Sequence, residues 1–345
     1  MTEYNLCVIQ GDGVGHEVIP CAVEVLQRVL PNLNLIPAEA GWACFERTGN
    51  ALPEETINRI SACGAALFGA VSSPSTKVAG YRSPIVQMRQ RFDLYANLRP
   101  TRGLETGVAR TGGFQKGVST QPAPVDLIIV RENTQGLYSG RETMRGDEAI
   151  AERVITRAAS ERIARVAFEL ASHRAHQHVT IVHKANILPI TDGTFRDAVR
   201  GVAASYPDVQ VDELLVDTAA MHLASQPQRF DVVVTTNLFG DILSDVASVW
   251  GGGMGVAPAL NKGTQVAIAE PVHGSAPDIA GQGIANPAGA ILSAALLLRY
   301  HWGLAGEAER VEQAVYGAID AGYRTKDLGG SFTTRQVADA IMERC

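Results

Sequence analysis

Short apolar runs rich in β-branched residues alternate with helix-like segments along most of the chain. The first pair is "NLCVIQ" followed by "GDGVGHEVIPCAVEVLQRVL", which predicts a strand, a glycine turn and a helix. The runs "LNLIPAEA", "AALFGAV", "VDLIIV", "HVTIVHKA" and "FDVVVTT" predict further strands. "LPEETINRISACG" predicts a helix between two of them, and residues 151–173 predict a longer helix with Ile155, Ile163, Val166 and Leu170 on its buried face. This alternation predicts an α/β sheet.

Composition narrows the class of protein. A chain of 345 residues, 46% hydrophobic and 19% charged, is an ordinary globular chain with room for about two domains. The net charge of -6 gives no hint of a nucleic-acid partner. The five cysteines form no CxxC pair, and the longest apolar run, "AGAILSAALLL", is too short to span a bilayer. With no signal-peptide pattern at the start, we expect a cytoplasmic protein without a membrane or nucleic-acid partner.

Two aspartates interrupt the helix-like segment that follows the strand "FDVVVTT". Asp241 and Asp245 are four residues apart, so they share one helix face, with Cβ atoms about 5–6 Å apart. Compensation of the helix dipole explains a carboxylate in the first turn but not a second one a turn later. A hard cation such as Mg²⁺ or Mn²⁺ would relieve the repulsion, because both ligands are carboxylates. Spacing alone leaves helix electrostatics and a cation site open, and Asp217 is a further aspartate in an apolar setting.

Several cationic residues border apolar strands. Arg89 and Arg99 flank "DLYANL", and Arg131 follows "VDLIIV". A surface position explains any one arginine, whereas several planar guanidinium groups beside buried strands would suit a small polyanionic substrate. Lys184 follows "HVTIVH" and is either a surface charge or, at the end of a parallel strand, a group in a ligand crevice. Desolvation in a crevice would lower its pKa and permit general-base chemistry.

Three further motifs suggest ligand contacts to different degrees. The turn "GDGVG" has the spacing GxGxG rather than GxGxxG, so a tight turn without a ligand competes with a phosphate cradle. His173, His176 and His178 are better explained by a polar helix end than by a metal site. "EPVHGSAPDIAGQGIANP" is typical of loops that bind ligands through backbone groups. Its Asp278 could accept hydrogen bonds from a ribose diol and would repel a phosphate, which favours NAD over NADP.

The motifs "LYANLRP", "VRENTQGLY", "HKAN", "TTNLFGDILSD" and "EPVHGSAPDIAGQGIANP" together resemble the β-decarboxylating dehydrogenases over essentially the whole chain. That family includes isopropylmalate, isocitrate, homoisocitrate and tartrate/D-malate dehydrogenases. The resemblance implies an isopropylmalate-dehydrogenase-like two-domain α/β fold, not a Rossmann fold, with a large mixed sheet shared by both domains and flanking helices. Residues 1–99 and 252–345 would form the cofactor-side domain. Residues 100–251 would carry the metal site and the interface of a homodimer with shared active sites, and pairing of dimers into tetramers is left open.

The resemblance also implies the catalytic and metal-binding residues. Asp241 and Asp245 match ligands of Mg²⁺ or Mn²⁺, and Asp217 matches the ligand donated by the partner subunit. Lys184, also from the partner, matches the base that removes the substrate's hydroxyl proton. Tyr138 matches the acid that protonates the enol carbon after CO₂ leaves. The active site is therefore expected to need residues from two chains.

Substrate and cofactor contacts follow in the same way. The residues matching substrate contacts, besides Tyr138 and Lys184, are Ser72, Val86, Arg89, Arg99, Arg131 and Asn186. The residues matching NAD contacts are Val14, Asn186, His273, Gly274, Ser275, Ala276, Asp278, Ile279 and Asn286.

The segment "SSPSTKVAGYRSPIV" bears on the choice of substrate. Isopropylmalate enzymes usually carry Gly-Gly-Pro and leucines here, whereas this segment looks most like homoisocitrate dehydrogenases of lysine biosynthesis by the α-aminoadipate route. Ser72 could hydrogen-bond a distal carboxylate, as could Arg82, and Val86 stands where some relatives that accept isocitrate place arginine. The resemblance favours a small tricarboxylate, homoisocitrate, oxidised with NAD to 2-oxoadipate and CO₂. Isopropylmalate, isocitrate and tartrate/D-malate are the alternatives.

An alternative of another class is a non-catalytic regulatory subunit. Such a subunit should have lost part of the metal or acid–base set, whereas all five of those side chains are present: Tyr138, Lys184, Asp217, Asp241 and Asp245. The intact set favours an enzyme.

Overall fold

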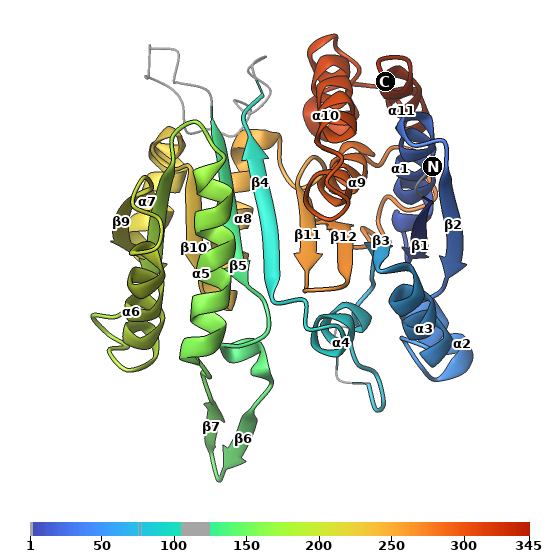
Figure 1. Ribbon diagram of the computed structural model, residues 1–345. Helices are drawn as coiled ribbons and strands as arrows, with labels where there is room; N and C mark the ends of the chain where they lie inside the picture. Colours follow the sequence, from blue (N-terminus) through green and yellow to red (C-terminus); the bar gives the residue numbers. More distant parts are fainter. Residues whose placement is uncertain (1–2, 75, 77, 105–124) are drawn as a thin grey trace. The chain divides into compact units, whose positions relative to one another are not determined.

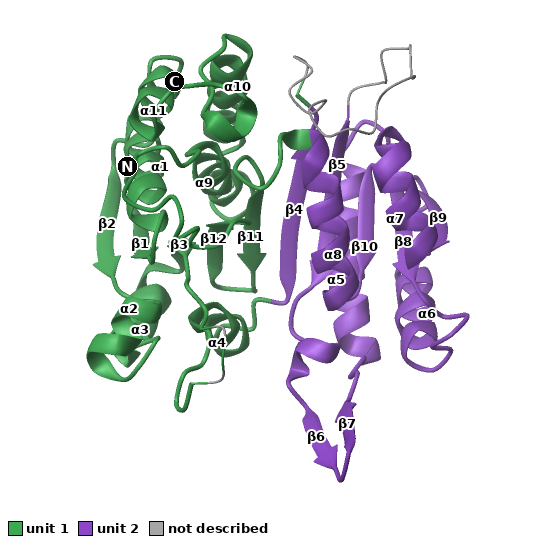
Figure 2. Cartoon of the chain, turned by 180° about the vertical axis from the view of Figure 1, so that it is seen from behind, with its two compact units in different colours: residues 1–94, 104–116, 251–345 green, residues 95–103, 117–250 purple. Residues whose placement is uncertain are grey.

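The computed structural model describes residues 3–74, 76, 78–104 and 125–345. It is a mixed α/β structure whose large mixed sheet has ten strands among these residues (Figure 1), so the predicted fold class is confirmed. The chain divides into two compact units (Figure 2). Unit 1 holds described residues of 3–94 and 251–345, and unit 2 holds those of 95–103 and 125–250. No helix in the described part of the chain is long and apolar enough to cross a membrane.

Unit 1 is built on strands in the order β2-β1-β3-β12-β11. The pairs β1–β2, β1–β3 and β3–β12 are parallel, whereas β11 runs antiparallel to β12. The strands are β1 (Tyr4–Gly11), β2 (Leu33–Ala38), β3 (Ala65–Ala70), β11 (Pro258–Lys262) and β12 (Ala267–Pro271). The α-helices are α1 (Gly15–Val29), α2 (Trp42–Thr48), α3 (Glu54–Cys63), α4 (Pro84–Arg91), α9 (Ala288–Tyr300), α10 (Ala305–Asp320) and α11 (Thr334–Met342).

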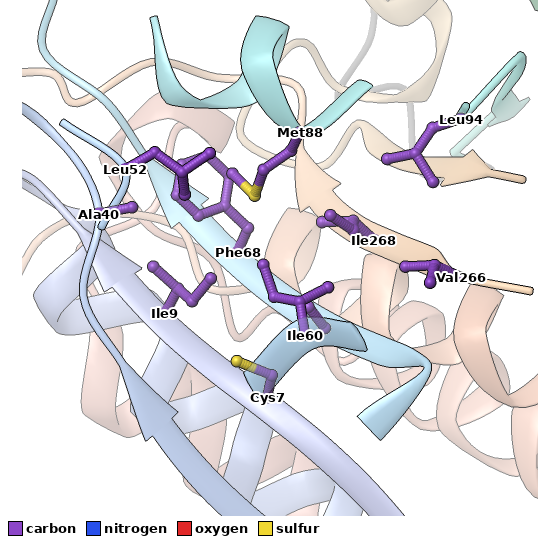
Figure 3. Close-up of a cluster of buried hydrophobic side chains, with 11 residues drawn as sticks. Cys7, Ile9, Ala40, Leu52, Ile60, Phe68, Met88, Leu94, Val266 and Ile268 are labelled. Atoms are coloured by element: carbon purple, nitrogen blue, oxygen red, sulfur yellow. The ribbon is translucent and has the colours of Figure 1, made fainter. Parts of the chain in front are cut away.

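The core of unit 1 follows the two-residue period of its strands. Cys7 and Ile9 of β1 point to the same face and pack with Phe68 of β3, Ile60 of α3 and Met88 of α4 (Figure 3). Helices α1 and α9 also pack on β3. All six residues of β3 are buried, as expected for a parallel strand covered on both faces.

Unit 2 is built on strands in the order β4-β5-β10-β8-β9. The pairs β5–β10, β10–β8 and β8–β9 are parallel, and β4 runs antiparallel to β5. A separate antiparallel hairpin, β6–β7, extends from the unit (Figure 1). The strands are β4 (Ala96–Arg102), β5 (Asp126–Glu132), β6 (Glu142–Arg145), β7 (Glu148–Ala151), β8 (His178–His183), β9 (Gln210–Leu215) and β10 (Val232–Thr235). The α-helices are α5 (Arg157–Ser172), α6 (Thr191–Ala203), α7 (Val216–Ser225) and α8 (Asn237–Ser248).

The long helix predicted over residues 151–173 begins later than expected. Thr156 caps α5, and its Oγ1 accepts a hydrogen bond at 3.3 Å from the backbone of the third helical residue. The segment before the cap includes β7, so the predicted start was wrong. Ile163 is buried as predicted, whereas Val166 and Leu170 are only partly buried. The buried face consists mainly of small residues that the apolar pattern passed over: Ala159, Ser160, Ala164, Ala167 and Ala171, with Phe168.

Candidate active site

Four parallel strands of unit 2 bring polar residues to one edge of the sheet. The strands β5, β10, β8 and β9 pair so that their carboxyl ends lie in register. Arg131 lies near the end of β5, α8 begins directly after β10, Lys184 follows β8, and Asp217 is the second residue of α7 after β9. In open α/β sheets this edge is where ligands bind. The candidate base, one metal-ligand candidate and one candidate substrate arginine therefore come from neighbouring strand ends.

Asp241 of α8 is the centre of a charged cluster in unit 2. Its Oδ1 accepts a hydrogen bond from Nη1 of Arg131 and lies 3.3 Å from Nη1 of Arg99. The hydroxyl of Tyr138 donates to its Oδ2 at 2.5 Å. Nη1 of Arg99 also lies 3.6 Å from Oδ1 of Asp245. Two arginines, two aspartates and the tyrosine that the sequence assigned to substrate, metal and acid roles thus lie in one cluster, in which the guanidinium groups offset the paired carboxylates.

Two residues of α8 that the sequence did not single out hold Arg131 in place. The Oδ1 atom of Asn237 accepts hydrogen bonds from Nε of Arg131 at 3.0 Å and from Nη2 at 2.7 Å. The arginine stem passes against Gly240, where an added Cβ would lie 2.6 Å from Cγ of Arg131. A glycine inside an amphipathic helix lowers helix stability and usually has a packing reason, so this signal could have found Gly240.

The carboxylates of Asp241 and Asp245 fit a hard divalent cation. Burial raises the pKa of the Asp245 carboxyl above its ordinary value, and the neighbouring carboxylate adds to the rise. The two side chains keep 32% and 51% of their surface exposed, so carboxylate oxygens are accessible to a ligand. Mg²⁺ binds proteins through one or two carboxylates and completes its shell with water and substrate oxygens. Among the described residues, no three His, Cys, Asp or Glu side chains are placed together to hold a metal.

Lys184 and Asp217 form an ion pair of their own. The hydrogen bond from Lys184 lowers the pKa of the Asp217 carboxyl, whose side chain is well exposed. The backbone N–H of Lys184 donates to Oδ2 of Asp192 at 2.6 Å, and Oδ1 of the fully buried Asp192 pairs with Nη2 of Arg153 at 2.7 Å. The base candidate therefore has a fixed backbone and a side chain at the surface. Such a pair is accessible to a second chain, which the role expected of both residues requires.

Arg89 lies in unit 1, on α4. Its Nε donates to Oδ1 of Asn261 at 3.0 Å, and its Nη2 donates to Oε1 of Glu270 at 2.8 Å. The amide of Asn261 also donates to Glu270 at 2.8 Å. Residues of β11 and β12 thus orient the guanidinium, and neither was evident from the sequence. Val86, three residues earlier on α4, is partly buried.

The loop after β12 packs on the glycine turn that precedes α1. The backbone N–H of Val14, which is itself buried, donates to the carbonyl oxygen of Ser275 at 2.9 Å. A Cβ at Gly13, where φ is +56°, would lie 2.1 Å from the same oxygen. Oε1 of Glu17 accepts a hydrogen bond from the backbone N–H of Gly281 at 2.6 Å. The turn therefore serves as a close backbone contact for this loop.

Two features of the same loop fit a site that binds a ligand. Burial lowers the pKa of His273, whose Nδ1 lies 2.9 Å from the carbonyl oxygen of Gly274. Its Nε2 is buried and has no hydrogen-bond partner among the described residues. Ala276 adopts a left-handed backbone conformation with φ of +41°, which residues other than glycine rarely adopt. An orphaned nitrogen and a strained backbone are both features that a bound ligand can explain.

The other cofactor candidates differ in burial and do not all belong to the same unit. Asn286 is buried, and its Nδ2 donates to Oδ2 of Asp327 at 3.1 Å. Asp278 is exposed and Ile279 is partly buried. Asn186 is exposed and belongs to unit 2, two residues after the base candidate.

Ser72 connects a substrate candidate with a cofactor candidate. Its hydroxyl donates to Oγ of Ser275 at 2.8 Å. An open cavity of about 530 Å³ begins at the next residue and is lined by Ser73, Pro74, Thr76, Val78, Ala79, Gly80, Tyr81 and Arg82.

The three-histidine motif lies elsewhere, in unit 2, where Nδ1 of His173 lies 2.8 Å from the carbonyl oxygen of Glu169. Its histidines belong to no metal-binding group within the described ranges.

The family model for isocitrate/isopropylmalate dehydrogenase matches residues 5–341. The chain belongs to this family. It is 50% identical over 340 residues to the isocitrate/homoisocitrate dehydrogenase of Thermus thermophilus, a match that covers 99% of this chain and 98% of the relative. It is 45% identical over 341 residues to the 3-isopropylmalate dehydrogenase of Methanothermobacter thermautotrophicus, covering 99% and 98%. The solved isocitrate dehydrogenase of Methylococcus capsulatus has a TM-score of 0.89 at 42% identity, covering 99% of both chains.

Membership in the isocitrate/isopropylmalate dehydrogenase family confirms the predicted family and makes the protein an oxidative decarboxylating dehydrogenase. Enzymes of this family generally use NAD(P) and a divalent metal. The names of the relatives divide between homoisocitrate, isocitrate and 3-isopropylmalate, so they do not decide the substrate.

Proposed function

We propose that this protein is a cytoplasmic, NAD-dependent homoisocitrate dehydrogenase of lysine biosynthesis by the α-aminoadipate route. The observation that supports the choice of substrate is the set of polar side chains in the cavity that begins at the residue after Ser72. Ser73, Thr76 and Arg82 supply hydroxyl groups and a cation, and none of the described residues that line the cavity is a leucine. Hydrogen-bond donors and a guanidinium suit the distal carboxylate of homoisocitrate, whereas an isopropyl group would leave them unpaired.

The residues of unit 2 would bind and activate the substrate by exchanging partners. Arg99 and Arg131, whose Nη1 atoms now lie against Asp241, would each give up that contact and offer the same nitrogen to a substrate carboxylate while the rest of the side chain stays in place. Lys184 of the partner subunit would take the hydroxyl proton while the hydride leaves the carbinol carbon for NAD. The phenol of Tyr138, released from Asp241, would return a proton to the enol carbon after CO₂ departs.

The metal would be held by Asp241, Asp245 and Asp217 of the partner subunit. When bound, Mg²⁺ or Mn²⁺ would stabilise negative charge on the ketone oxygen as CO₂ leaves. Without a bound metal, Arg99 and Arg131 neutralise the two carboxylates, so the cluster carries no uncompensated charge before the metal binds.

Exposed apolar side chains of unit 2 support a homodimer. Large hydrophobic residues on and near α7 and α8, which pack together, face solvent in the single chain. They are Ile187, Ile190, Met221, Ile242 and Val249. Large apolar side chains that are exposed in a single chain are typical of residues buried at an interface. The β6–β7 hairpin supports the same conclusion, because a solvent-exposed two-stranded ribbon is only marginally stable alone.

Steady-state kinetics on four substrates test the proposal. With Mg²⁺ and NAD, kcat/KM should be highest for homoisocitrate among homoisocitrate, isocitrate, isopropylmalate and D-malate. A higher value for isopropylmalate would overturn the choice of substrate. Absence of NADH formation with all four would instead favour the regulatory-subunit alternative.

Complementation tests the shared active site. The variants Lys184→Ala and Asp245→Asn should each be nearly inactive alone. Co-expressed, they should form hybrid dimers in which one site has an intact Lys184 and an intact Asp245, so part of the activity should return. No recovery in a purified hybrid dimer would show that each site uses residues of a single chain.

A further inference from the structure

All three polar groups of Ser72 are engaged within unit 1. Its backbone N–H donates to Oδ2 of Asp12 at 2.9 Å, and its carbonyl oxygen accepts a hydrogen bond from the hydroxyl of Tyr81 at 3.0 Å. Its own hydroxyl donates to Oγ of Ser275. The position of this serine is therefore set by groups that lie 60 residues before it, nine residues after it and 203 residues after it in the chain.

Asp12 is a fixed anchor rather than a mobile surface charge. It is only 5% exposed, and its carboxylate also accepts hydrogen bonds from the backbone N–H groups of Trp42 at 2.7 Å and Ala43 at 3.0 Å. A Cβ at Gly41, where φ is +127°, would lie 2.6 Å from Oδ2 of Asp12. The carboxylate thus ties the glycine turn, the start of α2 and Ser72 together through charge-assisted hydrogen bonds.

Tyr81, which bonds the carbonyl oxygen of Ser72, packs on the same helix, α2. Its ring centroid lies 5.2 Å from that of Trp42 and 5.3 Å from that of Phe45, in edge-to-face contacts. Burial raises the pKa of the Tyr81 hydroxyl above its ordinary value, so the group remains a hydrogen-bond donor at neutral pH. Helix α2 therefore braces both the donor and the acceptor that hold the backbone of Ser72.

We propose that Asp12 and Tyr81 are positioning residues that set substrate selectivity, because they fix Ser72 where the substrate loop, residues 72–84, meets the cofactor loop at Ser275. The cavity assigned to the variable part of the substrate begins at Ser73, the residue after Ser72, and Tyr81 is among the described residues that line it whereas Asp12 is not. Asp12 therefore acts through Ser72. The inference rests on the proposed function of this site and extends it.

The test compares Tyr81→Phe and Asp12→Asn with the wild-type enzyme on homoisocitrate and isopropylmalate. Tyr81→Phe keeps the ring and removes one hydrogen bond, so the ratio of kcat/KM for homoisocitrate to that for isopropylmalate should fall roughly 3- to 10-fold. Asp12→Asn weakens charge-assisted bonds, and the ratio should fall roughly 10- to 100-fold. In both variants the loss should appear in KM for homoisocitrate, with kcat changed by less than about twofold, because neither side chain performs chemistry.

Matched controls separate positioning from general destabilisation. Tyr206→Phe removes a phenol hydroxyl in unit 2, where the ring stacks on Phe168, and Asp231→Asn alters a buried carboxylate paired with Arg174. Asp231→Asn should lower the melting temperature, and both controls should keep the wild-type selectivity ratio. If Asp12→Asn does not fold, Asp12→Glu takes its place, because Tyr81 itself lines the cavity and Tyr81→Phe alone would not separate positioning from direct contact.

The result that overturns the inference is a folded variant with an unchanged ratio. A wild-type enzyme that turns over, together with Tyr81→Phe and Asp12→Asn enzymes of wild-type selectivity, would reduce both residues to a structural role. A wild-type enzyme that forms no NADH from any of the substrates would instead refute the proposed function. The two failures are therefore distinguishable.

Discussion

Replacement of Gly240 by alanine tests whether the close contact between Arg131 and Gly240 of α8 is needed for stability and activity. Gly240 lies within the helix and has no positive φ, so local propensity alone favours alanine by about 1 kcal/mol. The added Cβ, however, would lie 2.6 Å from Cγ and 2.7 Å from Cβ of Arg131. Helix propensity and overpacking therefore change the free energy of unfolding of Gly240→Ala in opposite directions.

Overpacking should win because Arg131 has nowhere to move. Its side chain is 1% exposed, and its guanidinium is held by Asn237 and Asp241. Forcing an extra methyl group into a packed site costs roughly 1–3 kcal/mol. After the gain in propensity, Gly240→Ala should lower the free energy of unfolding by roughly 0–2 kcal/mol. Displacement of the arginine by about 1 Å should lower kcat/KM roughly 100-fold.

Gly201→Ala is the matched control for this experiment. Gly201 lies on α6 in the same unit and has nothing within 4 Å of an added Cβ. It should stabilise the protein by about 0.4–1 kcal/mol and leave the kinetics unchanged. Urea unfolding and NADH absorbance measure both quantities. If Gly240→Ala were as stable and active as Gly201→Ala, the inferred contact with Arg131 would be refuted.

Three further outcomes are expected. Asp245→Asn should raise the Mg²⁺ concentration needed for half-maximal activity at least about tenfold and abolish the rise in melting temperature on adding Mg²⁺; an unchanged Mg²⁺ titration would remove Asp245 from the ligand set. The exposed carboxylate of Asp278 should make kcat/KM for NAD at least about tenfold higher than for NADP, and Asp278→Asn should narrow that gap; a wild-type preference for NADP would contradict it. Burial lowers the pKa values of His183, His273 and His301, so the unfolded chain takes up protons first as the pH falls through 6.5. Stability from these groups is complete above that pH and is lost below it, so the melting temperature should fall as the pH drops below about 6.5; His301→Asn should make that fall shallower, and an equal slope would show that His301 does not contribute.

The strands and the sheet edge were predictable because both depend on local patterns. Apolar runs with β-branched residues gave β1, β3, β5, β8 and β10, and the rule for parallel sheets placed Lys184 and the start of α8 at one edge. Helix α5 was predicted less well, since the periodic count gave weight to large apolar residues and its buried face consists mainly of alanines. Small residues pack closely without producing a strong hydrophobic signal.

The partners of the charged residues were not predictable from spacing. Arg131 and Asn237 are 106 residues apart, and Arg89 and Glu270 are 181 apart. The glycines beside Asp12 indicated a ligand-binding turn and gave no role to Asp12 itself. Its carboxylate accepts hydrogen bonds from the backbone of α2 and of Ser72. Contacts of this kind depend on the tertiary fold, and a local pattern contains no record of them.

If unit 2 holds the metal and the substrate as proposed, its paired charges predict that the two bind interdependently. Arg99 and Arg131 carry two positive charges, and Asp241 and Asp245 carry two negative charges when ionised, so the cluster is close to neutral. A divalent cation alone would take the carboxylates and leave the charges of two buried arginines without a counter-charge, and a polyanionic substrate alone would take the arginines and leave the two carboxylates without their cationic partners. The first event alone therefore incurs the cost of buried uncompensated charge, and the second leaves two partly exposed like charges close together. When both ligands arrive together every charge regains a partner, which explains why a site for an anion and a site for a cation share the same four side chains.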